Sequence, residues 1–175
     1  MARRPPDLRA RLARGAAVAL IALTFDDGPD PEFTPPLLDA LTRAGARATF
    51  FPLSPRVAMY PDLVRRIRAE GHLVGLHGWA HLKHPESTRP AVAADTDRAL
   101  AAFGEPVGWW RFPYGMAAPW SAELAAERDL RVAGWTHDTH DWRGDAAADM
   151  RFAPRPGEVV LMHDELGAVP SDRPG

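Results

Sequence analysis

The chain contains no cysteine among its 175 residues. Disulfide bonds and thiolate metal ligands are therefore excluded, and the redox compartment stays open because a domain of this size does not need disulfides. No apolar run is long enough to span a bilayer, so no membrane partner is expected. The chain also lacks a basic excess, with a formal net charge of -2. Because phosphate binding needs a net basic face, nucleic acid is not an expected partner.

The composition is that of one globular domain. Hydrophobic residues make up 46% and charged residues 25% of the chain, and its length is too short for two domains of ordinary size. We expect a basic N-terminal extension over residues 1–16, a single domain over residues 17–164 and a short C-terminal tail over residues 165–175. The protein is expected to be a monomer.

The apolar run over residues 16–23 follows a basic start and faintly resembles a signal peptide. It leads directly into Thr24-Phe25-Asp26-Asp27, without a polar spacer or a cleavage region. A buried strand explains the run better. The chain as it stands is therefore expected in the cytoplasm, unless an export signal lies outside this sequence.

Short apolar runs typical of buried strands alternate along the chain with helical patterns. Strands are predicted over residues 17–24, 46–51, 72–76, 107–112, 130–136 and 158–162. Helices are predicted over residues 36–44, with Thr34 as a cap, and over residues 62–70, 90–103 and 120–127. This alternation predicts an α/β fold with a mostly parallel sheet, either a barrel or an open sheet.

Parallel α/β folds gather their active sites at the carboxyl ends of the strands. Only the second predicted strand, followed by Pro52-Leu53-Ser54, delivers no charged or imidazole side chain to that rim. The other five strands are followed, in chain order, by Asp26-Asp27, by His77 and His81, by Arg111, by Asp138 and Asp141, and by His163-Asp164. Structural turns alone favour Gly, Asn and Ser at such points, so the pattern predicts an enzyme.

His77 and His81 are four residues apart, a spacing that on one helical turn points both imidazoles at one metal ion. The pattern is not that of a zincin, because Gly78 stands where the catalytic Glu would be. A further ligand is needed, and Asp26 or Asp27 is the natural source of a carboxylate. A cation would relieve the repulsion between these two, leaving one as ligand and the other as proton acceptor. The alternatives are a solvated turn and a chance histidine spacing.

Arg111 and His163 are the remaining candidates for chemistry. Arg111 could neutralise a catalytic Asp, neutralise an Asp of the 138–142 loop, or form a structural ion pair. His163, if paired with Asp138 or Asp141, is a candidate general acid for a leaving amine. The tryptophans either suit sugar rings or fill the core; they include Trp79, Trp110, Trp120, Trp135 and Trp142.

Together these motifs resemble those of the NodB-like polysaccharide deacetylases, carbohydrate esterase family four, over roughly residues 17–164. Five motifs occur in the family's order: TFDDGP at residues 24–29, HGWAH at 77–81, RFPYG at 111–115, DTHDW at 138–142 and LMHD at 161–164. One motif alone would be modest support, but five in order are highly specific. The resemblance implies a distorted, incomplete (β/α) barrel.

The resemblance also implies a metal centre with its base. Asp27, His77 and His81 would hold the metal, which is usually zinc, with cobalt or nickel as substitutes. Asp26 would be the general base for the attacking water, and Arg111 would orient and tune it.

The same resemblance implies roles on the leaving-group side. His163 would protonate the departing amine, and Asp141 would orient His163. The backbone N–H of Tyr114 would stabilise the oxyanion together with the metal. Trp142 and Leu161 would line the acetyl pocket.

Two departures from the family pattern stand out. Gly78 replaces a Ser or Thr that is frequent in the second motif, and the helix and strand that usually follow the fifth motif are not found. The function implied is metal-dependent N-deacetylation of amino sugars in a chitin-like or peptidoglycan-like glycan, by a family whose members are often exported. The alternatives are an O-acetyl esterase on a xylan-type polysaccharide and a truncated carbohydrate-binding pseudo-enzyme.

Overall fold

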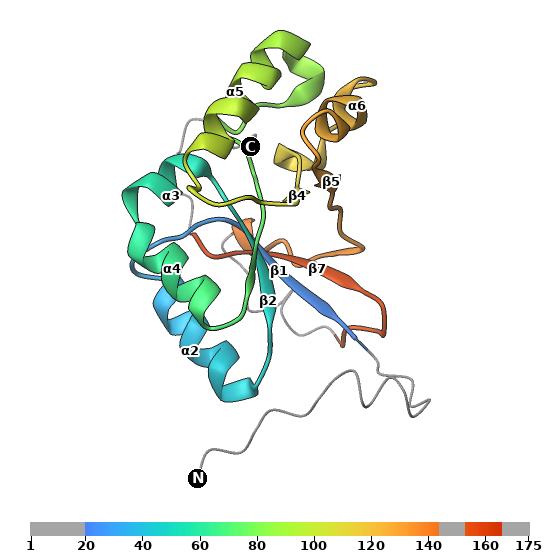
Figure 1. Cartoon of the computed structure of the whole chain (residues 1–175). Coiled ribbons are helices and arrows are strands. Elements are labelled where there is room, and N and C mark those ends of the chain that lie inside the picture. Colours follow the sequence, from blue (N-terminus) through green and yellow to red (C-terminus); the bar gives the residue numbers. More distant parts are fainter. Residues whose placement is uncertain (1–19, 144–152, 166–175) are drawn as a thin grey trace.

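The computed structural model describes residues 20–143 and 153–165 (Figure 1). The predicted extension over residues 1–16 and the predicted tail beyond Glu165 lie outside the described residues, as does the start of the first predicted strand. Within the described residues, no helix has the length and the apolar character to cross a membrane.

A parallel five-stranded sheet in the order β3-β2-β1-β7-β6 forms the centre of the fold. Its strands are β1 (Ala22–Asp27), β2 (Ala48–Pro52), β3 (Leu73–Val74), β6 (His137–Asp138) and β7 (Val159–His163). The register of β1 with β2 and β7 places Asp26 beside Phe51 and His163. Because side chains alternate along a strand, Thr24 and Asp26 share one face of β1 and Phe25 takes the other.

Two further parallel strands, β4 (Trp109–Trp110) and β5 (Arg131–Val132), extend this arrangement. A bridge between Leu76 and Trp110 joins them to the segment after β3. The described strands thus follow the order β6-β7-β1-β2-β3-β4-β5, as neighbours in a (β/α) barrel do, but no pairing between described strands joins β5 to β6. The predicted incomplete barrel is confirmed.

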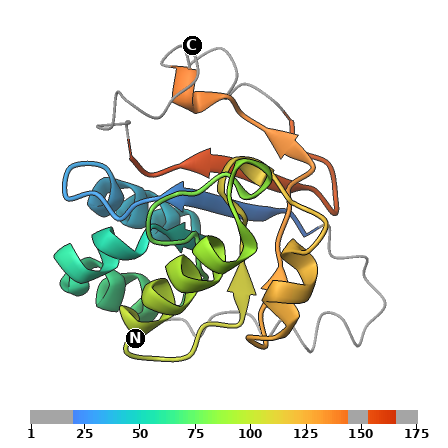
Figure 2. The same ribbon diagram turned by 90° about the horizontal axis from the view of Figure 1, so that it is seen from above.

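Helices α2, α3 and α4 lie along one side of β1 and β2, and α5 and α6 lie at the β4–β5 end of the molecule (Figures 1 and 2). Their bounds are α2 (Thr34–Ala44), α3 (Ser54–Met59), α4 (Pro61–Ala69), α5 (Arg89–Ala101) and α6 (Ser121–Ala126). Short 3-10 turns are η1 (His84–Glu86), η2 (Pro113–Gly115) and η3 (Asp141–Arg143).

The start of α2 corrects one prediction. The cap residue is Phe33, without a side-chain hydrogen bond, and Thr34 is the first residue of the helix. Pro35 and Pro36 follow, and their fixed φ suits a first helical turn. The hydroxyl of Thr34 is therefore not used as a helix cap; it donates to the carboxylate of Asp164, just past β7.

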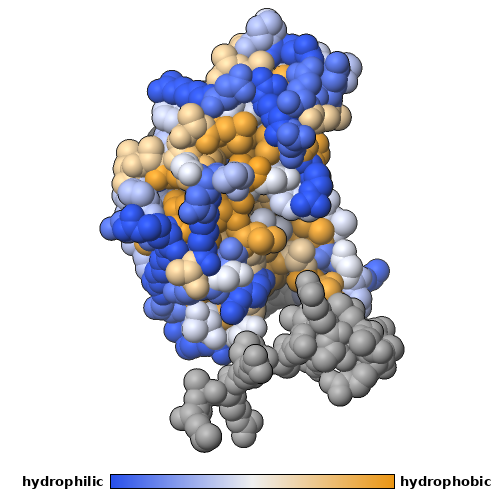
Figure 3. Space-filling model, viewed as in Figure 1, coloured by the Kyte–Doolittle hydropathy of each residue, from blue (hydrophilic) through white to orange (hydrophobic). Residues whose placement is uncertain are grey.

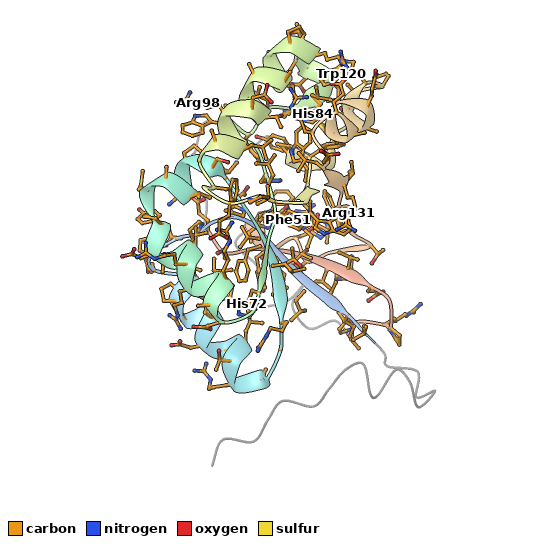
Figure 4. All side chains as sticks on the ribbon, in the orientation of Figure 1. Phe51, His72, His84, Arg98, Trp120 and Arg131 are labelled. Atoms are coloured by element: carbon orange, nitrogen blue, oxygen red, sulfur yellow. The ribbon has the colours of Figure 1, made fainter. Side chains whose placement is uncertain are left out.

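Two hydrophobic clusters stabilise the two ends of the molecule. One packs α2 and α4 against the sheet and includes Phe25, Leu38, Phe50, Ile67 and Val160. The other packs α5 and α6 against β4 and includes Leu76, Val92, Trp110, Phe112 and Leu124. Figure 4 shows His84 and Trp120 between α5 and α6, and their rings stack at 5.7 Å between centroids.

The inner face of the strands is incompletely filled. A cavity of about 310 Å³ lies there, and its walls include Thr24, Thr49, Leu73, Trp109 and Val132. Figure 3 shows apolar surface between the polar exteriors of the helices on the face seen in Figure 1. No pairing joins the described strands β5 and β6, and this side of the described barrel is open.

Several element bounds differ from the sequence-based expectations. The predicted strand over residues 130–136 is only the two-residue β5, and β6 and α3 were not predicted. Predicted strands over residues 72–76 and 107–112 shrink to β3 and β4. Strands of two residues carry no periodicity that a sequence pattern can reveal.

Candidate active site and metal centre

Asp27, His77 and His81 bring a carboxylate oxygen and two imidazole nitrogens within 4.8 Å of one another. Asp27 Oδ1 lies 3.3 Å from His77 Nε2 and 3.6 Å from His81 Nε2, and the two Nε2 atoms are 3.2 Å apart. Asp27 Oδ1 is buried and has no hydrogen-bond donor among the described residues, which is costly unless a cation compensates it. Because two imidazoles and one carboxylate are a donor set of open zinc sites, these residues fit a divalent cation.

The imidazole of His77 is oriented from behind. Its Nδ1 lies 2.9 Å from the backbone carbonyl oxygen of Arg111. A carbonyl only accepts, so Nδ1 carries the proton and donates it to this oxygen. In the neutral ring the Nε2 atom therefore carries the lone pair and faces Asp27, and this is the tautomer that a metal ligand requires.

The two histidines do not lie on a helical turn, which corrects the expectation from their spacing. The residues between them form a bend, and after α4, which ends at Ala69, no helix begins until His84. The carboxylate of Asp95, in α5, accepts the backbone N–H groups of Trp79 and Ala80 at 2.9 and 2.8 Å. This anchored loop, and not a helix, brings the two imidazoles together.

The backbone of the Asp27–His77–His81 cluster and its connecting loop has a positive φ at three positions. Asp27 and His81 have φ values of 77° and 52°, in the left-handed region that residues with a Cβ rarely adopt. Such conformations cost on the order of 1 kcal/mol and persist only where the surroundings fix them. Gly78 has φ of 99°, which glycine adopts without the strain that a residue with a Cβ would carry.

Asp26 and Arg111 form a buried ion pair beside the Asp27–His77–His81 cluster, with exposed fractions of 3% and 0%. Arg111 Nη1 donates to Asp26 Oδ1 and to Thr24 Oγ1, both at 2.8 Å, and Nη2 donates to the Gly134 carbonyl at 2.9 Å. The other carboxylate oxygen of Asp26 lies 3.8 Å from His77 Nε2. The sequence left open whether Arg111 pairs with a catalytic Asp or with an Asp of the 138–142 loop; in the structure its partner is Asp26.

The two adjacent carboxylates differ in acidity. Burial raises the pKa of Asp26, and the opposing effects of His77 and Arg111 do not cancel it. Burial also acts to raise the pKa of Asp27, but His77 and His81 outweigh it and the net direction is downward. For His77, burial lowers the pKa, whereas Asp26 and Asp27 raise it more. Asp27 is thus the more acidic, ligand-like carboxylate and Asp26 the more basic one.

His163 and Asp141 form a second pair across the rim. Asp141 Oδ1 lies 2.7 Å from His163 Nδ1, and Asp141 Oδ2 accepts the His163 backbone N–H at 2.8 Å. Burial lowers the pKa of His163, but the hydrogen bond to Asp141 and the nearby carboxylates raise it more, so the net direction is upward. This environment favours the protonated imidazole that a general acid needs.

A pocket of about 200 Å³ lies over these groups. Tyr114, Trp142 and Leu161, predicted from the resemblance to contact substrate, all line it together with Asp27 and His163. Tyr114 has φ of 57°, and its ring lies 4.3 Å from that of His81. The structure therefore brings every predicted site residue to one rim, while their roles stay predictions.

Three further residues contribute to the site. Trp135 and Asp138 line the pocket; the sequence marked the first only as one of several tryptophans and the second as a possible partner of His163. Asp138 instead accepts the backbone N–H of His140 at 2.8 Å. Asp95 was missed altogether, because no local pattern links it to the loop that it anchors.

Fold and site together define a class: a parallel, incomplete (β/α) barrel with a candidate metal centre at the carboxyl rim. The sequence model of the polysaccharide deacetylase family matches residues 14–133. The chain belongs to this family, as its five motifs predicted.

Curated relatives agree with this assignment. A peptidoglycan-N-acetylglucosamine deacetylase of Bacillus cereus is 34% identical over 157 residues, covering 85% of this chain and 57% of the relative. A chitooligosaccharide deacetylase of Bradyrhizobium is 36% identical, covering 82% and 70%. The chain spans only 32% of the peptidoglycan deacetylase PgdA of Listeria monocytogenes, at 37% identity. It thus matches as little as a third of some relatives' length.

Solved structures show the same fold. The peptidoglycan deacetylase PdaC of Bacillus subtilis aligns with a TM-score of 0.75 at 32% identity, over 83% of this chain and 74% of that one. A family 4 carbohydrate esterase of Streptomyces lividans, solved with acetate, aligns with a TM-score of 0.77 at 31% identity, over 86% and 81%. A family pseudoenzyme of Bacillus anthracis, 23% identical with a TM-score of 0.76, shares the fold alone.

Proposed function

We propose that this site removes acetyl groups from N-acetylated amino sugars of a peptidoglycan-like or chitin-like glycan. The observation that carries the proposal is that three groups lie side by side at the rim: the Asp27–His77–His81 cluster, the buried Asp26–Arg111 pair and the His163–Asp141 pair. Asp27 and His163 line the pocket directly. A hydrolysis of this kind needs a base for water and an acid for the leaving amine, and the two pairs supply one each.

The metal would be held by Asp27, His77 and His81. A divalent cation, zinc or in its place cobalt or nickel, supplies Lewis acidity toward the acetyl carbonyl and makes water more acidic. The residues that we assign to the cation leave Asp26 free for proton transfer, because its Oδ1 accepts from Arg111 and its Oδ2 points toward the ligand group.

Asp26 is the proposed base. It takes a proton from the attacking water as the water oxygen bonds to the acetyl carbon. Arg111 keeps Asp26 in place through a hydrogen bond of 2.8 Å and remains charged throughout. The backbone N–H of Tyr114 is assigned to the oxyanion that forms on the carbonyl oxygen.

His163 is the proposed acid. Its Nδ1 is engaged by Asp141, which leaves Nε2 to give a proton to the amide nitrogen. The carbon–nitrogen bond then breaks, and the free amine leaves with acetic acid, which ionises to acetate. Asp26 releases to solvent the proton that it took from water, and His163 takes up one from solvent to replace the proton that it gave. Trp142, Trp135 and Leu161 supply the apolar wall against which we place the acetyl methyl.

The named relatives support the substrate class. They are peptidoglycan-N-acetylglucosamine and chitooligosaccharide deacetylases, so N-acetylglucosamine units are the first substrate to test. Neither a xylan esterase nor a binding-only role gains support from the relatives at 30% identity or more that are named above.

The test is acetate release from chitooligosaccharides and from peptidoglycan by the purified chain, with added zinc or cobalt and, separately, with a chelator. Asp26→Asn should lower the rate by about 10²- to 10⁴-fold, the usual contribution of a general base. Asp97→Asn is the matched control, because Asp97 is an exposed partner of Arg128 and is neither in the Asp27–His77–His81 cluster nor in the pocket lining. A chelator-resistant activity, or an Asp26→Asn enzyme as fast as the control, would contradict the proposal.

A further inference from the structure

A buried hydrogen-bond network lies behind the turn that carries Asp27. The carboxylate of Asp164, 3% exposed, accepts the Thr34 hydroxyl at 2.7 Å through Oδ2 and the Gly28 backbone N–H at 3.2 Å through Oδ1. Thr34 Oγ1 in turn accepts the backbone N–H of Asp30 at 2.7 Å. The network therefore joins the end of β7, the first turn of α2 and both sides of the turn that follows Asp27.

The contact between Asp164 and the turn is close enough to dictate sequence. A Cβ at Gly28 would lie 2.3 Å from both carboxylate oxygens of Asp164 and 2.4 Å from its Cγ. Gly28 does not have a left-handed φ, so the space occupied by Asp164, and not the backbone conformation, requires glycine here. The Gly28 N–H also lies 3.0 Å from the Asp26 carbonyl oxygen, which closes a tight turn around Asp27.

The same network fixes an unfavourable backbone. Asp27 has φ of 77°, which is maintained only if the residues on both sides of it are held. Asp164 holds the residue after Asp27 through a side-chain hydrogen bond, and its backbone N–H lies 3.4 Å from the carbonyl oxygen of Asp26, the residue before. The buried Asp164 therefore holds the residues on both sides of Asp27 through hydrogen bonds. None of these hydrogen bonds involves the carboxylate of Asp27 itself.

We propose that Asp164 is a positioning residue for the metal centre: with Thr34 as its partner, it clamps the Asp27–Gly28 turn and aims the Asp27 carboxylate at His77 and His81. The proposal rests on the metal centre assigned under the proposed function. Outer partners that orient metal ligands are worth about 10- to 100-fold in metal affinity, and this clamp acts one residue away from the ligand itself.

The experiment is a titration of the metal-free protein with Co²⁺, followed by its visible absorption, which reports affinity and ligand geometry without turnover. Thr34→Val and Asp164→Ala should each weaken Co²⁺ binding about tenfold or more and alter the spectrum, and Thr34→Ser should restore both. Thr96→Val is the matched control: Thr96 is equally buried, and its hydroxyl donates only to Val92 within α5. If the loss of a buried hydroxyl were the only effect, Thr34→Val and Thr96→Val would both be less stable. The Co²⁺ affinity would then be unchanged in both.

Wild-type affinity and spectrum in both Thr34→Val and Asp164→Ala would overturn the proposal. If the wild-type chain itself binds no Co²⁺, the proposed metal centre fails, and the clamp is judged separately by amide hydrogen exchange in the metal-free protein. The Asp30 N–H, which donates to Thr34, should then exchange faster in Thr34→Val and in Asp164→Ala but not in Thr96→Val. Unchanged exchange in both would overturn the clamp as well.

A second test combines a larger residue at position 28 with a smaller one at position 164. Gly28→Ala should abolish Co²⁺ binding while Asp164 is present, because the new methyl group meets its carboxylate. In Asp164→Ala the three atoms nearest to the new methyl group are removed, so the double variant should bind Co²⁺ no more weakly than Asp164→Ala alone. Independent, additive losses would show that Asp164 does not occupy the space beside the turn, against the proposal.

Discussion

Two buried histidines, one at the carboxyl rim and one between α5 and α6, show what makes a site. His77 and His84 are almost equally buried, with exposed fractions of 2% and 1%. His77 faces the carboxylates of Asp26 and Asp27, and these raise its pKa despite burial. His84 lies among aromatic rings, and burial lowers its pKa to about 4.

The difference lies in the partners and not in burial. The surroundings of His77 stabilise a positive charge, whether a proton or a metal ion, and its Nε2 faces another imidazole. His84 has a neutral partner: Ser121 Oγ accepts the Ala118 N–H and can donate its own proton to His84 Nδ1 at 2.8 Å. The first environment is suited to a cation and the second to a neutral ring in a packed core.

The largest expected effect comes from breaking the cation site. His77→Ala should weaken zinc or cobalt binding on the order of a thousandfold, because it removes one of the three proposed ligands, and should abolish the proposed deacetylation. His84→Asn replaces a histidine that is as buried as His77 and should leave the metal affinity within about twofold of the wild-type value. Isothermal titration of both metal-free proteins checks this, and equal affinities would remove the distinction between the two regions.

Next in size is the loss of charge balance at the rim. Arg111→Met leaves the buried carboxylate of Asp26 without its partner and should cost about 3–5 kcal/mol of unfolding free energy. Adding Asp26→Asn should recover part of that stability while activity stays absent. Urea unfolding of the metal-free single and double variants measures both effects; a double variant as unstable as the sum of the two singles would contradict a direct pair.

His84, the histidine of the core, should affect how the stability of the protein depends on pH. The pKa of His84 falls from 6.5 to about 4 on folding, so the folded state binds fewer protons than the unfolded state between these values. The stabilisation that comes from a neutral His84 is complete above pH 6.5 and is lost as the pH falls toward 4. At about 1.4 kcal/mol per pKa unit, the loss of unfolding free energy amounts to about 3 kcal/mol.

His84→Asn removes this titration while keeping a side-chain acceptor for Ser121. The variant should therefore lose less stability than the wild type between pH 7 and pH 4.5, as measured by chemical unfolding at each pH. His72, whose pKa burial also lowers, is present in both proteins and cancels from the comparison. Parallel pH profiles for the two proteins would show that His84 does not titrate as a buried neutral ring.

The rim could be predicted from sequence because its residues come in short strings directly after strands. Asp26-Asp27 and His163 are each attached to an apolar run that forms a real strand, β1 or β7. Their convergence follows from parallel topology alone, without knowledge of loop geometry.

What sequence could not provide depends on contacts between distant segments. Thr34 has the appearance of a helix cap, yet its hydroxyl serves Asp164, 130 residues away. The His77–His81 spacing indicated a helical turn, but Asp95 and a left-handed Gly78 shape a loop instead. Such tertiary hydrogen bonds override local propensity and leave no periodic signal.

The smallest effect expected at the rim concerns how His163 is held. Asp141→Asn keeps the size of the side chain but replaces the charge beside His163 Nδ1, so the pKa of His163 should fall. Because the proposed acid acts in its protonated form, the alkaline limb of the pH–rate profile should move to lower pH, with about a tenfold loss of rate above neutrality and less in acid. His140→Gln, in the same loop, is the control: the backbone N–H and the imidazole of His140 both face Asp138 and not His163, so the limb should stay in place. A uniform loss of rate at every pH would instead show that Asp141 supports the loop structurally. The rim would then keep the charged Asp26–Arg111 pair as its proposed base, but Asp141 would not set the pKa of the proposed acid His163.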